Sequence, residues 1–169
     1  DLEQFQPDPN ADRKSYLIVS ALVPYKRIDR AIEAARISNE PLIIVGDGPE
    51  RENLEAKAPE NVTFLGWVSK KELVKAYQNS RALLFPGEED FGITPLEAMA
   101  CGTPVIALGR GGVTETVKTP DTGVFFDHEK DEMLAGVMAE TLAKFRWEEH
   151  YLRTGPDRAG EFSLDGFRT

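Results

Sequence analysis

Short apolar runs alternate with longer segments of helical periodicity along most of this chain, and this alternation limits the folds open to it. The runs are about four residues long and mostly apolar, without strict polar alternation, which is typical of a strand buried on both faces. Strands joined by single helices imply right-handed crossovers. The pattern therefore predicts an α/β fold, a doubly wound, Rossmann-like parallel six-stranded sheet with helices on both faces. The six predicted strand–helix units are 16–19 with 28–37, 42–45 with 50–58, 62–65 with 70–79, 82–85 with 95–100, 105–108 with 113–117, and 123–126 with 129–145.

The charge balance of the chain narrows its ligands and partners. Its 169 residues are enough to enclose one core, and 41% hydrophobic with 29% charged residues is close to the composition of globular domains. The formal net charge of -9 repels nucleic-acid phosphates and anionic lipid surfaces, so no nucleic-acid partner is expected. An anionic ligand must therefore be held by a local arrangement of groups.

Cysteine content and hydropathy bear on the predicted location. Cys101 is the single cysteine, which excludes an internal disulfide and suits a reducing compartment. Its place at a predicted helix end favours a packing role over a nucleophilic one. The longest apolar runs, such as 42–45 and 82–85, are far shorter than the ~18 residues of a membrane helix, and no signal peptide opens the chain. We expect a soluble, cytoplasmic domain without a transmembrane segment.

Three segments are predicted along the chain. Residues 1–12 include Pro7 and Pro9 and few apolar residues, which indicates an extended interdomain linker. Residues 13–147 carry the strand–helix units and form the Rossmann-like domain. Residues 148–169 are predicted to be a C-terminal helical tail.

Ligands of doubly wound domains bind beyond the carboxyl ends of the strands, where loops lead into helix N-termini. Within the fourth such loop, Thr94 is a predicted N-cap, with Pro95 at the first helical position and Glu97 three residues after the cap. The backbone N–H groups of this helix start, together with Gly92, suit a diphosphate. Taken alone, the same residues also fit an ordinary capped helix. The candidate loops are 21–27, 46–49, 66–69, 86–95 and 109–112.

The stretch around this helix also matches a specific pattern. Glu89 and Glu97 are spaced as E-x7-E and are followed by Ala-x-Ala-x-Gly-x-Pro-Val. In this pattern the chain resembles the C-terminal, donor-binding domain of family 4 retaining glycosyltransferases, which have two Rossmann-like domains in the GT-B architecture. The resemblance covers the chain to about residue 145, includes an opening segment similar to the interdomain connector, and implies a nucleotide-sugar-binding domain. Further matching phrases are Gly46-Asp-Gly-Pro-Glu50, Val62-Thr-Phe-Leu-Gly-Trp-Val68, Gly111-Gly-Val-Thr-Glu115 and Thr122-Gly123.

The segment 20–29 resembles the phosphate-binding loop of O-antigen type mannosyltransferases in that family. The resemblance implies that Lys26 holds the donor diphosphate. A compact cation at a strand end is what a negatively charged domain requires to retain a doubly anionic leaving group. Many relatives carry an arginine five residues before this lysine, where this chain has Ala21. We expect Arg27 to compensate.

The same resemblance assigns the two glutamates to different parts of the donor. Glu97 accepts hydrogen bonds from the ribose hydroxyls, and Glu89 lies beside the donor hexose, where its charge favours an oxocarbenium-like transition state. We assign Glu89, the candidate catalytic residue, to the sugar and not to covalent chemistry. The other expected donor-binding residues are Phe91, Gly92, Ile93 and Thr94 for the diphosphate and hexose, and Gly46, Pro49 and Val68 around the nucleoside.

Other motifs argue against different chemistries. The phrase 46–51 follows a strand, but Arg51 stands where a dinucleotide fingerprint has its third glycine, which disfavours NAD. The acidic run 88–90 lacks an Asp-x-Asp pair and the family generally needs no metal, so neither a metal nor another cofactor is expected. His128 and His150 have no metal-ligand spacing and are predicted to lie in helical surface regions.

For function, the resemblance implies one half of a two-domain enzyme. The intact enzyme transfers a hexose with retention of configuration to a glycan or lipid-linked acceptor, and a peripheral membrane location is open to it. GDP-mannose is the favoured donor, while UDP-glucose and related donors stay open. The general base and most of the acceptor site belong to the N-terminal domain, so this chain is expected to bind donor weakly and turn over little. Alternative interpretations are half of a sugar-nucleotide epimerase and a non-catalytic nucleotide-sugar-binding module.

Overall fold

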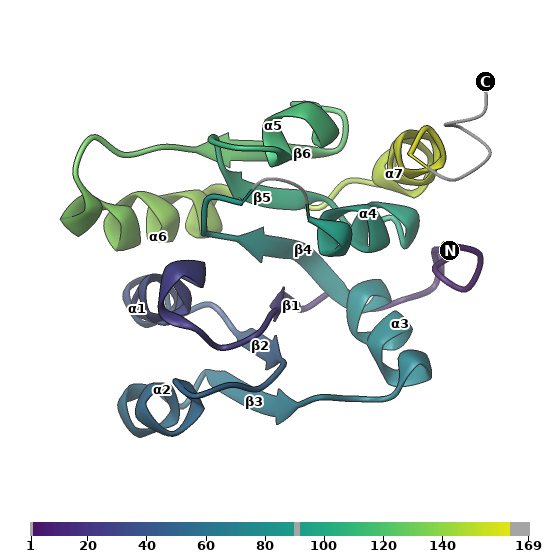
Figure 1. Ribbon diagram of the computed structural model, residues 1–169. Helices are drawn as coiled ribbons and strands as arrows, with labels where there is room; N and C mark the ends of the chain where they lie inside the picture. The colour runs from purple at the N-terminus through teal and green to yellow at the C-terminus, as the bar shows by residue number, and fades with distance from the viewer. Residues whose placement is uncertain (1, 90–91, 163–169) are drawn as a thin grey trace.

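The computed structural model describes residues 2–89 and 92–162, in which six parallel strands form one sheet between two layers of helices (Figure 1). The order of the strands is β3-β2-β1-β4-β5-β6, and every neighbouring pair is parallel. The predicted doubly wound, Rossmann-like fold is confirmed. The strands are β1 (Ser15–Val19), β2 (Leu42–Val45), β3 (Val62–Gly66), β4 (Ser80–Phe85), β5 (Val105–Leu108) and β6 (Gly123–Phe126).

Helices cover both faces of the sheet, as the alternation of apolar runs and helical segments predicts. In Figure 1, α1, α2 and α6 lie against one face, and α3, α4 and α7 lie against the other. The α-helices are α1 (Ile28–Ser38), α2 (Arg51–Lys57), α3 (Lys70–Gln78), α4 (Ile93–Ala100), α5 (Val113–Thr116), α6 (Leu134–Lys144) and α7 (Tyr151–Gly160), and the 3-10 turns are η1 (Pro24–Lys26) and η2 (Asp131–Met133).

Alternate residues of β1 point to opposite faces of the sheet and divide the core in two. Tyr16 and Ile18 are buried in the cluster that includes α1 and α6, whereas Leu17 and Val19 are buried in the cluster that includes α4. The Tyr16 hydroxyl donates to the Leu142 carbonyl oxygen at 2.7 Å, so its polar end is satisfied inside the first cluster. Because helices cover both faces, the strand is apolar at successive positions.

Two helix starts differ from their predicted positions by two or more residues. α4 begins at Ile93 with Gly92 as its N-cap, so Thr94 already lies in the first turn and is not the cap. The helix predicted over 129–145 begins at Leu134, after η2. The residues between β6 and η2 are polar, and they offer no apolar stripe that would hold a helix against the sheet.

The segment before β1 packs onto the domain. Phe5 is buried in the same cluster as α4. The Arg13 guanidinium donates to the carbonyl oxygens of Ser80 and Cys101 at 2.8 and 2.9 Å, and it lies 4.8 Å from the centroid of the Trp147 ring. Burial lowers the pKa of Arg13 to about 10. The segment before β1 and the segment between α6 and α7 therefore meet near the C-terminal end of α4.

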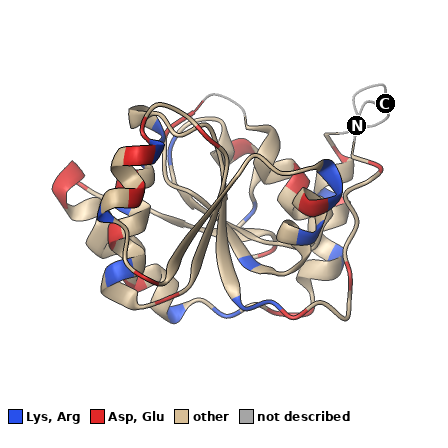
Figure 2. Ribbon diagram, turned by 90° about the horizontal axis from the view of Figure 1, so that it is seen from below, with Lys and Arg blue, Asp and Glu red and all other residues tan. Residues whose placement is uncertain are grey.

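Charged residues lie mainly on the helices and connecting loops, and the strands at the centre are largely uncharged (Figure 2). α7 packs against α4 and fills much of the described part of the predicted helical tail, 148–169. Residues 163–169 of that tail lie outside the described residues. Within the part of the chain that the structure describes, no helix is both long and apolar enough to cross a bilayer.

Candidate functional site

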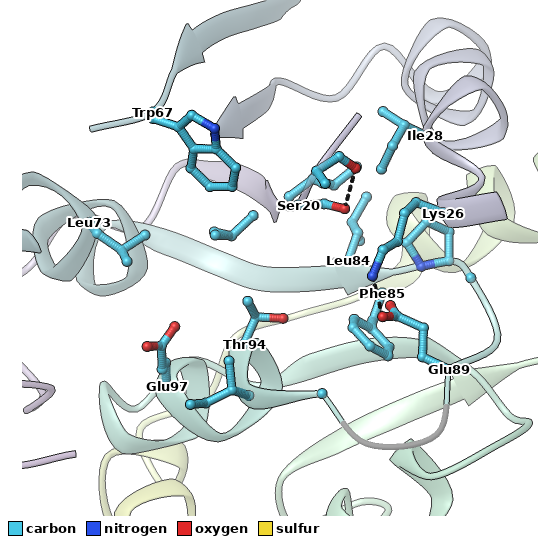
Figure 3. A pocket seen from close by; sticks show the side chains of 17 residues that line it. Ser20, Lys26, Ile28, Trp67, Leu73, Leu84, Phe85, Glu89, Thr94 and Glu97 are labelled. Carbon is cyan, nitrogen blue, oxygen red and sulfur yellow. Dashed lines mark hydrogen bonds and ion pairs between the residues drawn. The ribbon is translucent and has the colours of Figure 1, made fainter. Parts of the chain in front are cut away.

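A cleft of about 450 Å³ opens at the carboxyl ends of β1 and β4 (Figure 3). These two strands are neighbours in the sheet, although β2 and β3 separate them in sequence. The chain leaves β1 toward α1 on one face and leaves β4 toward α4 on the other (Figure 1). This is the switch point of a doubly wound sheet, where such domains bind ligands, and the volume suits a small molecule.

The structure brings most of the predicted donor-site residues to this cleft. They come from η1, from the loop after β4 and from α4, so three separate segments build the site. The predicted residues that line the cleft are Lys26, Glu89, Gly92, Ile93, Thr94 and Glu97. Those that do not line it are Arg27, Gly46, Pro49 and Val68, and Phe91 lies outside the described residues.

An ion pair forms one end of the cleft. The Lys26 ammonium group donates to a carboxylate oxygen of Glu89, and 18% and 19% of these side chains are exposed. Gly87 permits the close approach of their two loops, because a Cβ there would lie 3.0 Å from the Tyr25 carbonyl oxygen and 3.2 Å from Lys26 Cα. The pair is reachable from the cleft, so a phosphate can take the place of Glu89 as the partner of the ammonium group.

The first turn of α4 forms the adjoining wall. Its N-cap, Gly92, is extended (φ -107°, ψ 132°), and no side chain caps the helix. Ile93 and Thr94 of this first turn line the cleft, so backbone N–H groups of the helix start and the positive end of the helix dipole lie beside it. The Thr94 hydroxyl, which the sequence predicts to be the cap, also lies at the cleft (Figure 3). This wall has the character of an anion-binding site.

Glu97 stands at the other end of the cleft and is held by a tyrosine. The Tyr77 hydroxyl of α3 donates to Glu97 Oε1 at 2.9 Å, and the Tyr77 ring is fully buried, edge-on to Phe5 with centroids 5.9 Å apart. Burial raises the pKa of Glu97, and the hydrogen bond from Tyr77 and the charge of Lys70 partly offset that rise. Burial also raises the pKa of Tyr77, so the phenol keeps its proton and stays a donor. The second oxygen of Glu97 has capacity for ligand hydroxyls.

Arg27 is held away from the cleft. It is the N-cap of α1 with φ 59°, in the left-handed region, and its guanidinium and that of Arg30 both donate to Asp131 of η2. The hydrogen bonds from these arginines lower the pKa of Asp131 to about 2. Ala21, which stands where many relatives carry an arginine, does line the cleft. Among the described residues that line it, Lys26 is the single cation. The expected compensation by Arg27 is not found.

Residues predicted around the nucleoside contribute to loop packing. Gly46 has φ 137°, and a Cβ there would lie 1.8 Å from the Ser20 carbonyl oxygen. This approach places the loop after β2 against the loop after β1 at the edge of the cleft. Pro49 lies in the turn before α2, and Val68 lines a separate groove beside α3. Contact of these residues with a nucleoside stays a prediction.

The structure adds lining residues that the sequence analysis did not single out. Trp67 directly follows β3 and is 63% exposed. Leu73 of α3 and Ser20 at the end of β1 line the same cleft, and the Ser20 hydroxyl donates to the Ala21 carbonyl oxygen at 2.8 Å. The sequence signal for Trp67 is an aromatic residue directly after a predicted strand, inside the candidate loop 66–69.

The described residues give little support to metal or thiol chemistry. Among them, no group of three His, Cys, Asp or Glu side chains is arranged to hold a metal ion, and Asp90 of the acidic run is not one of them. Cys101 is fully buried at the end of α4, and burial raises its pKa to about 12, so the thiolate is disfavoured. His128 follows β6 and His150 precedes α7, so neither lies inside a helix as predicted.

The strand order is that of a Rossmann-like doubly wound domain, and the cleft lies at the switch point where such domains bind ligands. The family model described as "Glycosyl transferases group 1" matches residues 1–153. The chain belongs to this family of glycosyltransferases.

Curated relatives of similar sequence are also glycosyltransferases. A GDP-mannose-dependent alpha-(1-6)-phosphatidylinositol monomannoside mannosyltransferase of Mycobacterium tuberculosis is 33% identical over 171 residues, which cover 84% of this chain and 44% of the relative. A D-inositol 3-phosphate glycosyltransferase of a Mycobacterium species is 32% identical, over 75% of this chain and 34% of the relative. The chain thus spans less than half the length of these relatives.

Solved structures of similar fold come from the GT-B glycosyltransferases. The sucrose-phosphate synthase of Thermosynechococcus elongatus superposes with a TM-score of 0.76 at 25% identity, over 98% of this chain and 47% of that one. The C-terminal domain of a glycosyl transferase group 1 family protein from Francisella tularensis superposes with a TM-score of 0.73 at 19% identity, over 96% of this chain and 97% of that one. The second likeness concerns the fold alone. The described sheet and helices are therefore those of one Rossmann-like unit of the GT-B architecture.

Proposed function

We propose that this chain is the donor-binding domain of a retaining hexosyltransferase that transfers mannose from GDP-mannose to a glycan or lipid-linked acceptor. The observation that carries the proposal is a row of groups along one cleft. Lys26 and Glu89 lie at one end, the first turn of α4 lies in the middle, and Glu97 lies at the other end (Figure 3). The relative named as GDP-mannose-dependent supports this choice of donor.

Each part of the row suits one part of a nucleoside diphosphate sugar. A carboxylate accepts hydrogen bonds from vicinal hydroxyls, so Glu97 binds the ribose. Backbone N–H groups at the start of α4 and the Lys26 ammonium group offset the charge of the diphosphate. When the phosphate pairs with Lys26, the Lys26–Glu89 ion pair breaks, and the Glu89 carboxylate can then face the hexose.

The same groups favour bond breaking over mere binding. Negative charge on the leaving diphosphate grows as the bond to the sugar breaks, and Lys26 and the α4 N-terminus stabilise that charge most in the transition state. Glu89 offsets the positive charge that develops on the sugar ring. Retention follows when the acceptor hydroxyl attacks from the face that the diphosphate leaves, with a phosphate oxygen taking its proton. The proposed step uses no metal ion, because the helix start and Lys26 supply the positive charge.

The acceptor site is placed, in this proposal, in the part of the relatives that this chain does not cover. The chain spans 44% of the length of the Mycobacterium tuberculosis relative. An open cleft keeps water near the reacting bond and lacks contacts from a facing domain. We therefore expect the chain by itself to bind the donor weakly and to turn over little.

Calorimetric titration of this chain with GDP, GDP-mannose, UDP and UDP-glucose tests the proposal. We expect GDP and GDP-mannose to bind, and Lys26→Ala and Glu97→Ala to weaken binding by about tenfold or more. Lys144→Ala is the matched control, because Lys144 is an exposed lysine that pairs with Glu140 on α6. Tighter binding of the uridine nucleotides would overturn the choice of donor. Absence of all nucleotide binding at millimolar concentration would overturn the donor-binding role.

A further inference from the structure

Trp67 is a large exposed side chain of the cleft to which the proposed donor contacts give no task. Its indole is 63% exposed, yet it lines the cleft together with Leu73. In Figure 3, Trp67 and Glu97 lie on opposite sides of the same end of the cleft, and Lys26 lies at the far end. An indole left in water carries a large apolar surface that a planar ligand can cover.

The backbone around Trp67 is fixed on both sides. Gly66 has φ 71°, in the left-handed region, and its carbonyl oxygen accepts from the Gly46 N–H at 2.9 Å. Two residues after Trp67, Ser69 caps α3, because its hydroxyl accepts from the Glu72 N–H at 3.2 Å. The segment that carries Trp67 is therefore anchored to the sheet at one end and to a helix at the other, which limits where its ring can lie.

The position of Trp67 relative to Glu97 determines what the indole can meet. A ribose bound by Glu97 carries its base on the carbon opposite the diphosphate, and the diphosphate lies toward Lys26. The base then projects to the end of the cleft that Trp67 and Leu73 line. Aromatic side chains stack on nucleobases at such places, and the contact strengthens with the area of the stacked faces.

We propose that Trp67 is the stacking platform for the nucleobase of the donor, and that its ring selects a purine over a pyrimidine. The inference rests on the proposed function in taking Glu97 as the ribose ligand and Lys26 as the diphosphate ligand. It goes further in assigning base selection to a side chain. A purine presents two fused rings to the indole, whereas a pyrimidine presents one, so the purine covers more of the exposed surface.

Titration calorimetry of Trp67→Ala and Trp67→Phe with GDP, ADP, UDP and inorganic pyrophosphate tests the inference. Loss of one stacking contact weakens binding about tenfold. We expect that loss for GDP and ADP with Trp67→Ala, a smaller loss for UDP, and no change for pyrophosphate, which has no base. Trp67→Phe keeps an aromatic face and restores most of the affinity. Leu65→Ala is the matched control, because Leu65 is a neighbouring exposed residue at 48% that does not line the cleft.

Intrinsic fluorescence gives a second readout from the same proteins. The chain has two tryptophans, and Trp147 lies beyond the far end of α4, where its indole N–H donates to the Gly102 carbonyl oxygen at 3.1 Å. GDP should change the emission of the wild-type chain and leave that of Trp67→Phe, which reports Trp147 alone, unchanged. Pyrophosphate should change neither.

The outcomes separate this inference from the function on which it rests. If GDP binds the wild-type chain and Trp67→Ala equally well, the base does not stack on Trp67, and the donor-binding role stands. If Trp67→Ala weakens pyrophosphate as much as GDP, the substitution acts through the loop, and the inference is wrong. If no nucleotide binds the wild-type chain, the proposed function itself fails.

Discussion

The two glutamates at the ends of the cleft are eight positions apart in sequence but are held by different chemistry. Glu89 meets the charged ammonium group of Lys26, with both side chains about a fifth exposed. Glu97 meets the neutral phenol of the buried Tyr77 at 2.9 Å, between α3 and α4. One contact joins opposite charges near solvent, and the other supports a carboxylate with a single neutral donor.

This difference separates two tasks within one site. Lys26 keeps a charged partner when an incoming phosphate replaces Glu89, and Glu89 can turn into the cleft, so we expect this exchange to have a small cost. A partly buried carboxylate whose hydrogen-bonding capacity is only partly used gains from ligand hydroxyls that fill the rest. At the Lys26 end, a ligand phosphate is therefore expected to replace Glu89 as the partner of the lysine. At the Tyr77 end, ligand hydroxyls are expected to add to the hydrogen bond that Glu97 already has.

Of the substitutions at the two ends of the cleft, Glu97→Gln should change nucleotide affinity the most. An amide has one acceptor oxygen and no charge, where the carboxylate has two charged acceptor oxygens, so nucleotide affinity should fall about 100-fold by calorimetry. Burial raises the folded-state pKa of Glu97 above its unfolded value, so its ionised form opposes folding as pH rises through that pKa. The amide lacks this penalty. The Tm of Glu97→Gln should therefore rise relative to wild type at neutral pH and not at a pH below about 4. If Glu97→Gln and the wild-type chain bind nucleotide with equal affinity, Glu97 does not contact the ligand. Glu140→Gln on α6 is the control.

Tyr77→Phe should weaken the same end without removing the carboxylate. Glu97 is partly buried and loses its one described hydrogen-bond donor, so nucleotide affinity should fall about tenfold near neutral pH. The pKa of Glu97 rises further without the phenol, so the decline of affinity toward acid should begin at a higher pH than in wild type. Tyr16→Phe loses a comparable buried hydrogen bond on the other face and should change stability alone. An unshifted acid decline in Tyr77→Phe would show that Tyr77 only fills space.

Ala21→Arg should strengthen the opposite end. Ala21 is exposed and lines the cleft, in which Lys26 is the one described cation. A second cation should raise the affinity for GDP about fivefold at low salt, and the gain should shrink as ionic strength increases. Titrations at two salt concentrations measure it. A gain that does not depend on salt would point to a cause other than charge.

Glu89→Gln should give the smallest change and the opposite sign to Glu97→Gln. Without its carboxylate partner, Lys26 is free before the ligand arrives, so the affinity for GDP should rise about threefold. Calorimetry with GDP and pyrophosphate measures the change, and both ligands should gain alike. A loss of GDP affinity as large as that of Glu97→Gln would mean that both glutamates contact the bound ligand.

The sheet was predictable because its signal is local. Most strands are apolar runs and helices cover both faces, so the runs at 42–45, 105–108 and 123–126 match the observed strands in full. The start of α6 was not predictable to the residue. The polar stretch after β6 fits a helix by composition, and only the absence of an apolar face for the sheet delays the helix to Leu134.

The candidate site was predictable where it follows from strand ends and not where it depends on distant partners. Lys26, Glu89 and Glu97 lie in or beside loops chosen from the sequence, and the structure gathers them in one cleft. Arg27 was expected there as well, but Asp131, 104 positions away, holds its guanidinium elsewhere. Neither this contact nor the one between Tyr77 and Glu97 can be predicted from the spacing of residues along the sequence, because both depend on how helices pack.

The strap formed by residues 2–14 also determines where the chain can be trimmed. Removal of Arg13 would leave the carbonyl oxygen of Cys101 without its side-chain donor, and a buried polar group left unmatched costs about 1–3 kcal/mol. Removal of Phe5 would uncover the ring of Tyr77. Proteolytic or engineered shortening at the N-terminus would therefore disturb the cleft indirectly, because Phe5 packs on Tyr77 and Tyr77 holds Glu97. No residue of the strap itself lines the cleft.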